Sequence, residues 1–197
     1  MALRPVNRRT FAAGLVAALA MPHLAANARA ETGFGTVRLV RTPACGNDPL
    51  TPAQTAGPFF SSGSPRKANF TRDSEGGAPI LLFGLVLDRD CRPVPGAKID
   101  IWHADAAGRY DNSGFRLRGH QFSDDQGRWR VQTILPGLYP GRTRHIHVRV
   151  QPRGGSILTT QLYFPRIAQN RRDGLFDPNL LMAFDPGAGR GRFDFVV

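Results

Sequence analysis

Hydrophobic positions along the chain occur in short runs or in strict alternation, and glycine- and proline-rich turns separate them. The continuous apolar run 79–87 is typical of a buried strand, whereas Ile99 and Ile101 recur with the two-residue period of a half-buried one. No sustained helical period stands out. Strands are therefore predicted at 79–87, 97–102, 129–133, 145–151, 157–164 and 192–197.

Such regular short strands indicate an all-β fold, an antiparallel β-sandwich with long connecting loops. Residues 165–191 are rich in Arg, Asp, Gly and Pro, so we expect a surface loop with one short helical turn there. In 145–151 the alternation places polar and aliphatic side chains on opposite faces of the predicted strand. His145 and His147 share one face of the predicted strand, and Ile146, Val148 and Val150 share the other.

The first thirty residues carry the features of an export signal. Arg8 and Arg9 form a twin-arginine pair, the apolar stretch 11–21 is too short to span a bilayer, and 28–30 is an A-x-A cleavage site. We therefore predict a signal peptide at 1–30 and a bacterial periplasmic or secreted protein without stable membrane insertion after cleavage. A short amphipathic helix is the alternative, which the lack of polar periodicity disfavours.

The remaining length suits one domain, which we divide into an N-terminal arm at 31–78 and a β-sandwich at 79–197. The formal charge of +11 falls to +7 without the four arginines of the leader, since 22 basic and 15 acidic residues remain. The arginines are dispersed and no reader motif is present, so nucleic-acid binding is not expected. A homo-oligomer is compatible with the sequence.

Two cysteines occur, Cys45 and Cys91. In an oxidising compartment an even count favours a disulfide, which would add roughly 3–4 kcal/mol of stability by closing the loop between them. Two free thiols are the alternative.

Two of the three tyrosines lie near the histidine pair in sequence: Tyr110 and Tyr139 precede His145 and His147. A tight turn after Tyr139 can bring its phenol beside the two imidazoles. Imidazole binds several transition metals, whereas phenolate is a hard anionic donor that favours a trivalent ion. The four side chains therefore predict a ferric site.

The segments around these residues resemble the signature motifs of the intradiol ring-cleavage dioxygenases, in the same order along the chain. The resemblance covers about 50–164. Its parts are Leu50-Thr51-Pro52-Ala53-Gln54-Thr55-Ala56-Gly57-Pro58-Phe59-Phe60, Trp102-His103-Ala104-Asp105 through Tyr110, Leu135-Pro136-Gly137-Leu138-Tyr139-Pro140-Gly141-Arg142, His145-Ile146-His147-Val148 and Thr160-Gln161-Leu162-Tyr163-Phe164.

The resemblance implies roles for particular residues. Tyr110, Tyr139, His145 and His147 match the protein ligands of a non-haem Fe(III) cofactor, and Tyr139 matches the tyrosine released when the substrate binds. Arg142 matches an active-site arginine that stabilises negative charge, and Gln161 matches a glutamine close to the substrate. The implied reaction cleaves a small aromatic diol with O₂ between its hydroxylated carbons to give a muconate. Surface positions are the alternatives for Arg142 and Gln161.

The chain departs from familiar members of that family at Gly141, where the protocatechuate enzymes have tryptophan, in the short interval from Tyr139 to His145, and in lacking a long helical N-terminal region. A more open pocket is therefore expected. His103, His120 and Tyr163 match no role and are interpreted as structural, and Trp102 and Trp129 as core packing. Two other classes remain: a non-catalytic β-sandwich module that binds carbohydrate or aromatic ligands, and a copper protein built on the histidine pair.

Overall fold

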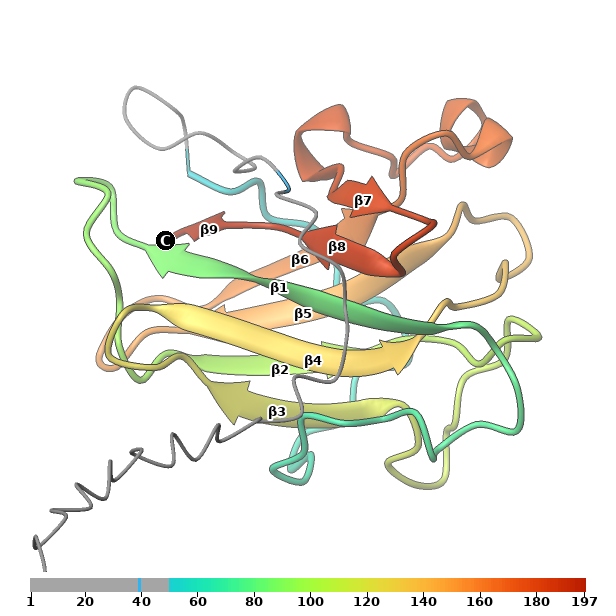
Figure 1. The fold of residues 1–197 in the computed structure, drawn as a ribbon, viewed down its shortest axis with the longest axis horizontal. Helices are drawn as coiled ribbons and strands as arrows, with labels where there is room; N and C mark the ends of the chain where they lie inside the picture. The colour runs from blue at the N-terminus through green and yellow to red at the C-terminus, as the bar shows by residue number, and fades with distance from the viewer. Residues whose placement is uncertain (1–38, 40–49) are drawn as a thin grey trace, which may run out of the picture. The chain divides into compact units, whose positions relative to one another are not determined.

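The computed structural model describes residue 39 and residues 50–197, and these form two stacked β-sheets with two short 3₁₀ turns (Figure 1). The elements in chain order are β1 (Pro79–Leu87), β2 (Lys98–Trp102), β3 (Arg118–Phe122), β4 (Arg128–Ile134), β5 (His145–Gln151), β6 (Leu158–Tyr163), η1 (Ala168–Arg171), η2 (Pro178–Leu180), β7 (Ala183–Asp185), β8 (Arg190–Arg192) and β9 (Phe195–Val196).

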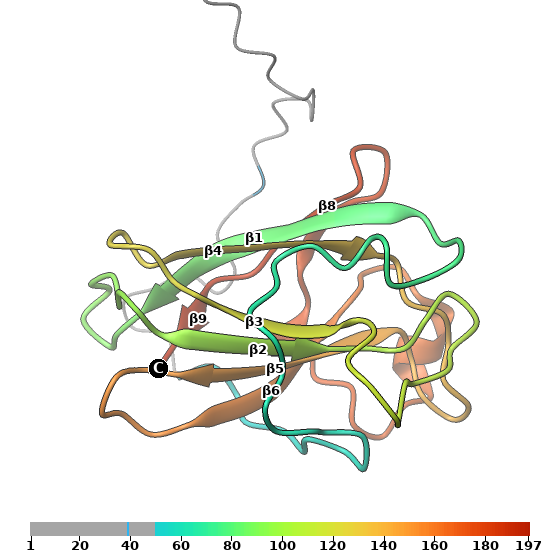
Figure 2. The same cartoon turned by 90° about the horizontal axis from the view of Figure 1, so that it is seen from below.

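One sheet has the order β4-β1-β8-β7, with β9 also paired to β1, and the other has the order β3-β2-β5-β6. Figure 2 shows the two layers edge-on. Most neighbouring strands run antiparallel, whereas β8 and β9 both pair with β1 in parallel. The predicted all-β sandwich is confirmed.

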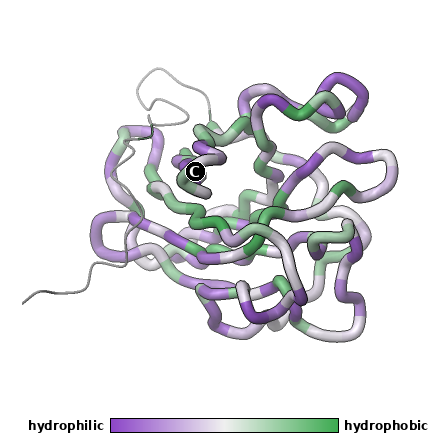
Figure 3. Tube along the Cα trace, turned by 45° about the vertical axis from the view of Figure 1, so that its right-hand side comes forward, coloured by the Kyte–Doolittle hydropathy of each residue, from purple (hydrophilic) through white to green (hydrophobic). Residues whose placement is uncertain are grey.

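The core lies between the sheets and follows the alternation seen in the sequence. Leu82 and Val131 are fully buried from one sheet, and Ile99, Val148 and Val150 from the other. Figure 3 shows apolar residues along the strands and polar residues in many of the connecting loops. Burial of these alternating positions on folding is what selects this register, because a shift by one residue would turn each apolar set outward.

The prediction for 165–191 was wrong in part. The segment contains two 3₁₀ turns and two short strands, and Leu180 and Met182 are buried in the core. Strand β3 was not predicted at all, because its sequence Arg-Gly-His-Gln-Phe has no apolar alternation. Its place in the sheet comes from pairing with β2.

The predicted single strand 192–197 is also divided. Asp194 interrupts it: its fully buried carboxylate accepts a hydrogen bond of 2.9 Å from the Leu85 amide and pairs with Arg192. Between β8 and β9, the Leu85 amide of β1 therefore bonds to the Asp194 side chain and not to a backbone carbonyl. Along this part of β1, backbone pairing continues from the Phe193 amide to the Phe83 carbonyl at 3.0 Å.

Residues 50–78 pack onto the sandwich before β1 begins. The Thr51 amide donates to the Val196 carbonyl at 3.0 Å, and the Val196 amide donates back to the Thr51 hydroxyl at 2.8 Å. Phe70 is fully buried in the core. The arm therefore carries Thr55, Gly57 and Phe59 across the face of the histidine-bearing sheet, where they meet the candidate site.

Residues 1–30 and Cys45 lie outside the described residues, so the signal peptide, the domain limits and the Cys45–Cys91 bridge stay predictions. Within the described part of the chain, no helix is long and apolar enough to cross a membrane.

Candidate active site

The two histidines stand at the start of β5, on the same face of its sheet, as predicted. β5 lies between β2 and β6, so His147 is opposite Trp102 on one side and Gln161 on the other, and His145 is opposite Tyr163. The imidazole centroids of His145 and His147 are 4.9 Å apart, and both side chains are buried. The strand therefore holds two imidazoles side by side.

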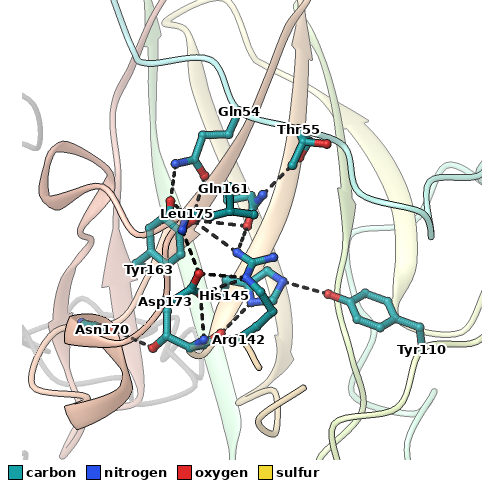
Figure 4. A network of polar contacts seen from close by, with 11 residues as sticks. Gln54, Thr55, Tyr110, Arg142, His145, Gln161, Tyr163, Asn170, Asp173 and Leu175 are labelled. Carbon is teal, nitrogen blue, oxygen red and sulfur yellow. Dashed lines mark hydrogen bonds and ion pairs between the residues drawn. The ribbon is translucent and has the colours of Figure 1, made fainter. Parts of the chain in front are cut away.

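His145 is held in one tautomer by its surroundings. Its Nδ1 lies 2.6 Å from the Thr143 carbonyl oxygen, which can only accept, so Nδ1 carries the hydrogen. Nε2 then carries the lone pair and accepts a hydrogen bond of 3.1 Å from the Tyr110 hydroxyl (Figure 4). Burial lowers the pKa of His145 to about 4, so the ring is neutral near pH 7.

His147 is fixed by stacking rather than by a hydrogen bond. The Trp102 indole lies parallel to it, with ring centroids 5.0 Å apart and an angle of 5° between the planes. On another side a Cβ atom at Gly57 would lie 3.4 Å from the His147 ring. Burial first, and then nearby His145, lower its pKa to about 2, and its Nδ1 has no hydrogen-bond partner among the described residues. A buried neutral imidazole with an unpaired nitrogen is a strong candidate for a metal ligand.

The two tyrosines approach the histidines from separate loops. The Tyr110 ring centroid lies 5.8 Å from that of Tyr139 and 6.1 Å from that of His147. Phe59 of the arm stacks on Tyr110 with centroids 4.4 Å apart. Burial raises the pKa of Tyr110 well above its usual value, so this phenol ionises only if a cation lies beside it.

A glycine keeps the two tyrosine loops in contact. Gly108 has a φ of +83°, and a Cβ atom there would overlap the carbonyl oxygen of Leu138, next to Tyr139. Only glycine combines that backbone conformation with so close an approach. The Gly108-Arg109-Tyr110 motif thus positions one tyrosine against the loop that carries the other.

The four rings fit a metal ion that accepts nitrogen and oxygen donors. The two imidazoles are neutral, and the buried phenol of Tyr110 requires a positive charge to become a phenolate. Among the described residues, no group of three or more His, Cys, Asp or Glu side chains comes together. A metal ion held by this histidine pair would therefore need tyrosine oxygens among its donors, which favours a hard ion over a copper site built on the histidines alone.

Arg142 lies beside this set, in a network of buried polar groups (Figure 4). Its Nε lies 2.9 and 3.1 Å from the two carboxylate oxygens of Asp173, and its Nη2 donates to Gln161 Oε1 at 2.6 Å. The Arg142 side chain is 18% exposed. The surface alternative for this residue is therefore wrong.

Asp173 is a member of the network that sequence reasoning missed. Burial alone would raise the pKa of its carboxyl, but hydrogen bonds from the backbone amides of Leu175 and Thr143 and from Arg142 lower it below its usual value. The carboxylate therefore stays ionised and holds the guanidinium in place. Asp173 follows η1, 31 residues from Arg142, and no motif marks it in the sequence.

Gln161 is fully buried, so its surface alternative is also wrong. Its amide nitrogen donates to the Thr55 carbonyl at 3.1 Å while its Oε1 accepts from Arg142. The amide orientation is thereby fixed, and Gln161 accepts from Nη2 of the guanidinium while Asp173 accepts from Nε.

Tyr163 belongs to the same network. Its hydroxyl lies 2.7 Å from both Gln54 Oε1 and the Leu175 carbonyl oxygen, and burial raises its pKa to about 12. Tyr163 is therefore a neutral supporting group, in line with the structural interpretation.

The remaining singled-out residues divide between core and site. His103 is buried and bonded to the Ala104 carbonyl and the Thr133 hydroxyl, and His120 is bonded to Ser64, so both are structural. Trp129 packs in the core. Trp102 is the exception, because it stacks on a candidate ligand rather than only filling space.

A cavity of about 340 Å³ opens beside Tyr139 and Arg142. Its lining residues are Leu138, Tyr139, Pro140, Gly141, Arg142, Thr143, Gln169, Arg172 and Asp173. A larger groove of about 810 Å³ is lined mainly by β1 and β4, with Gln121 and Phe122 of β3, and includes none of the four rings. The smaller cavity is therefore the candidate substrate site.

An all-β sandwich that gathers two tyrosines and two histidines, with a cavity lined by Tyr139 and Arg142 next to them, defines a candidate oxygenase-type metal centre. Comparison with known proteins identifies the family: the protein-family model described as "Dioxygenase" matches residues 55–173 of this sequence. The chain belongs to this family, that of the intradiol ring-cleavage dioxygenases.

Among curated relatives, the catechol 1,2-dioxygenase of Acinetobacter baylyi is 31% identical over 60% of this chain and 48% of its own length. The hydroxyquinol 1,2-dioxygenase of Nocardioides simplex is 32% identical over 75% of this chain and 64% of its own length. The chain thus spans about half of the first relative and less than two thirds of the second.

Solved structures show the same fold. The dioxygenase domain of a dioxygenase–carbohydrate-binding protein fusion from Streptomyces sp. SirexAA-E is 48% identical, with a TM-score of 0.73 over 76% of this chain and 98% of that one. An intradiol ring-cleavage dioxygenase from Tetranychus urticae is 25% identical, with a TM-score of 0.68 over 76% of this chain and 94% of that one.

Proposed function

We propose that the protein is an Fe(III)-dependent intradiol dioxygenase that cleaves a catechol-type ring between its two hydroxylated carbons, with O₂, to give a muconate. The observation that carries the proposal is the convergence of two phenols and two neutral imidazoles beside the Arg142–Gln161 pair. Family membership supports the reaction class.

Tyr110, Tyr139, His145 and His147 would hold the ferric ion. When bound, the iron supplies a Lewis acid and electron acceptor that activates an aromatic diol toward O₂. The chain prepares its ligands in advance: the Thr143 carbonyl fixes the His145 tautomer, and Trp102 fixes the plane of His147.

The other residues act on the substrate. Tyr139 lines the cavity, so its phenolic oxygen is the ligand best placed to accept a proton from an incoming diol. Arg142 lines the same cavity, and its permanent positive charge stabilises negative charge that develops on the ring. Gln161 and Asp173 hold the guanidinium in orientation from two sides.

Colour tests the metal centre. We expect the wild-type protein to be burgundy from tyrosinate-to-iron charge transfer, and Tyr110→Phe and Tyr139→Phe each to shift or weaken the visible band. Tyr163→Phe removes the third tyrosine, which contacts Arg142 but is no proposed ligand, and should leave the band in place. A wild-type protein that cannot be reconstituted with iron would end the proposal.

Product analysis tests the reaction. Oxygen uptake with formation of an ultraviolet-absorbing cis,cis-muconate is expected from catechol, substituted catechols or hydroxyquinol. A yellow semialdehyde would instead show extradiol cleavage. If an iron-loaded, coloured protein consumed no oxygen with any of them, a non-catalytic binding module would be the better assignment.

We further propose that residues 1–30 direct export of the folded protein to the periplasm or beyond. The support is the Arg8-Arg9 pair with the A-x-A site at 28–30. Replacement of both arginines by lysine should retain the protein in the cytoplasm, and unchanged fractionation would contradict this.

A further inference from the structure

The cavity beside Tyr139 combines an apolar wall with a cationic rim. Its volume of about 340 Å³ lies within the range of about 300–1,000 Å³ typical of small-ligand sites. Leu138 is 40% exposed and contributes, with Tyr139 and Pro140, a surface suited to an aromatic ring. Arg142 and Arg172, two permanently charged residues, line the same cavity.

The single acid that lines this cavity, Asp173, stays ionised, and both of its oxygens already have hydrogen-bond donors. Each of its carboxylate oxygens accepts one backbone hydrogen bond, from Leu175 at 2.9 Å and from Thr143 at 2.8 Å, and both contact Arg142. Arg142 is therefore committed to an internal ion pair, and Asp173 has no capacity left for Arg172.

Arg172 is in a different situation. Its side chain is exposed, and no hydrogen bond or ion pair engages its guanidinium within the part of the chain that the structure describes. Its backbone is nevertheless fixed, because its amide donates to the Gln169 carbonyl at 2.9 Å and closes η1. A cation without a partner is thus anchored at the rim of the cavity.

We propose that Arg172 determines substrate specificity by binding a carboxylate carried on a short side chain of the catechol. The inference rests on the proposed function, which places the diol at the Tyr139 end of the cavity. A side chain on the ring would then extend toward the rim, where the planar guanidinium can donate two parallel hydrogen bonds to a carboxylate. Because Arg172 is exposed, a carboxylate attached directly to the ring fits less well than one on a flexible tail.

The test compares an acid with its neutral counterpart. The two substrates are 3-(3,4-dihydroxyphenyl)propanoate and its methyl ester, which share the ring and the side chain and differ in charge. We expect the wild-type kcat/KM for the acid to exceed that for the ester by roughly three- to fivefold at low salt, the scale of one solvent-exposed ion pair. Raising the salt from about 0.05 to about 0.5 M should reduce this ratio.

Substitution of Arg172 should change the ratio of kcat/KM for the acid to that for the ester. Arg172→Glu should bring the acid-to-ester ratio below one, and Arg172→Gln should bring it near one. The matched control is Arg171→Glu, an equal charge change at the adjacent exposed residue, which does not line the cavity. It should alter the ratio by less than about twofold, since Arg171 does not line the cavity and can act on a bound carboxylate only through solvent, without a direct ion pair.

Anaerobic titration of the visible band with acid and ester gives the same ratio for binding, without turnover. Equal ratios in wild type and Arg172→Glu, or an equal effect of Arg171→Glu, would overturn the assignment while leaving the dioxygenase intact. Preference for 3,4-dihydroxybenzoate over the propanoate, insensitive to Arg172→Glu, would also overturn it. If neither acid nor ester bound or reacted, and simple catechols did not either, the proposed function itself would be wrong.

Discussion

Replacing His147 by alanine should remove most of the bound iron and, with it, both the colour and the ring-cleaving activity. His147 offers a neutral imidazole that is buried against Trp102 and Gly57, and water cannot take its place without entering this apolar contact. Loss of a supporting residue around a metal typically costs about 10–100-fold in affinity, so loss of a ligand should cost at least ~100-fold. His145→Ala should behave alike. Iron content per chain and the visible spectrum measure the loss in both alanine variants.

The matched control is His120→Gln on β3, which is separated from β5 by β2 in the same sheet. This imidazole is half-buried and bonded to Ser64, away from the two tyrosines, so its loss should leave iron and colour unchanged. Thermal unfolding of each iron-free variant separates loss of metal from loss of fold. Full iron occupancy in both alanine variants would remove the histidine pair from the ligand set.

The fold was predictable from sequence wherever burial imposes a period on the chain. β1 and β5 have the predicted bounds, and the split of β5 into a histidine face and an aliphatic face is present in the structure. β3 could not be predicted, because its residues are polar and its place depends on pairing with β2. β8 and β9 were read as one strand, because the interruption depends on Asp194 meeting the distant Leu85 amide.

In the site, too, residues that are close in sequence could be predicted, whereas a residue distant in sequence could not. The motif around Tyr139, Arg142, His145 and His147 is nearly continuous in sequence, and a turn joins the Arg142 amide to the Tyr139 carbonyl at 3.0 Å. The two imidazoles lie side by side as predicted, and the approach of the Tyr139 phenol to them stays a prediction. Asp173 could not be predicted, since an aspartate in an Arg- and Asp-rich segment gives no sign that it will be buried against Arg142. Asp173 pairs with Arg142 because the end of η1 places it there.

Trp102 shows why the type of residue alone can mislead. A tryptophan in an apolar strand usually packs in the core, and Trp129 does so. Trp102 is equally buried, but the register between β2 and β5 sets it opposite His147, where its indole lies flat on the imidazole. Strand register is a long-range property, so the positioning role followed from the structure and not from the composition of the strand.

Arg142→Ala should keep the iron and the colour yet lower kcat by about 10²–10³-fold, the scale seen when one preorganised charge-stabilising donor is removed. The guanidinium is no ligand, so the metal set stays complete, and Asp173 retains its backbone donors from Thr143 and Leu175. The loss should fall mainly on kcat rather than KM, because charge that develops on the ring is present in the transition state and not in the bound diol.

Two further variants distinguish charge from orientation. Arg142→Lys keeps a positive charge but cannot reach Asp173 and Gln161 together with one ammonium group in the same geometry, so it should recover only part of kcat. Asp173→Asn keeps the guanidinium and removes the charge that orients it, so a smaller loss is expected, again with iron and colour retained. Stopped-flow turnover of the coloured enzyme with catechol measures all three. An Arg142→Ala variant with wild-type kcat would show that the guanidinium serves only to anchor Asp173 and the loop after η1.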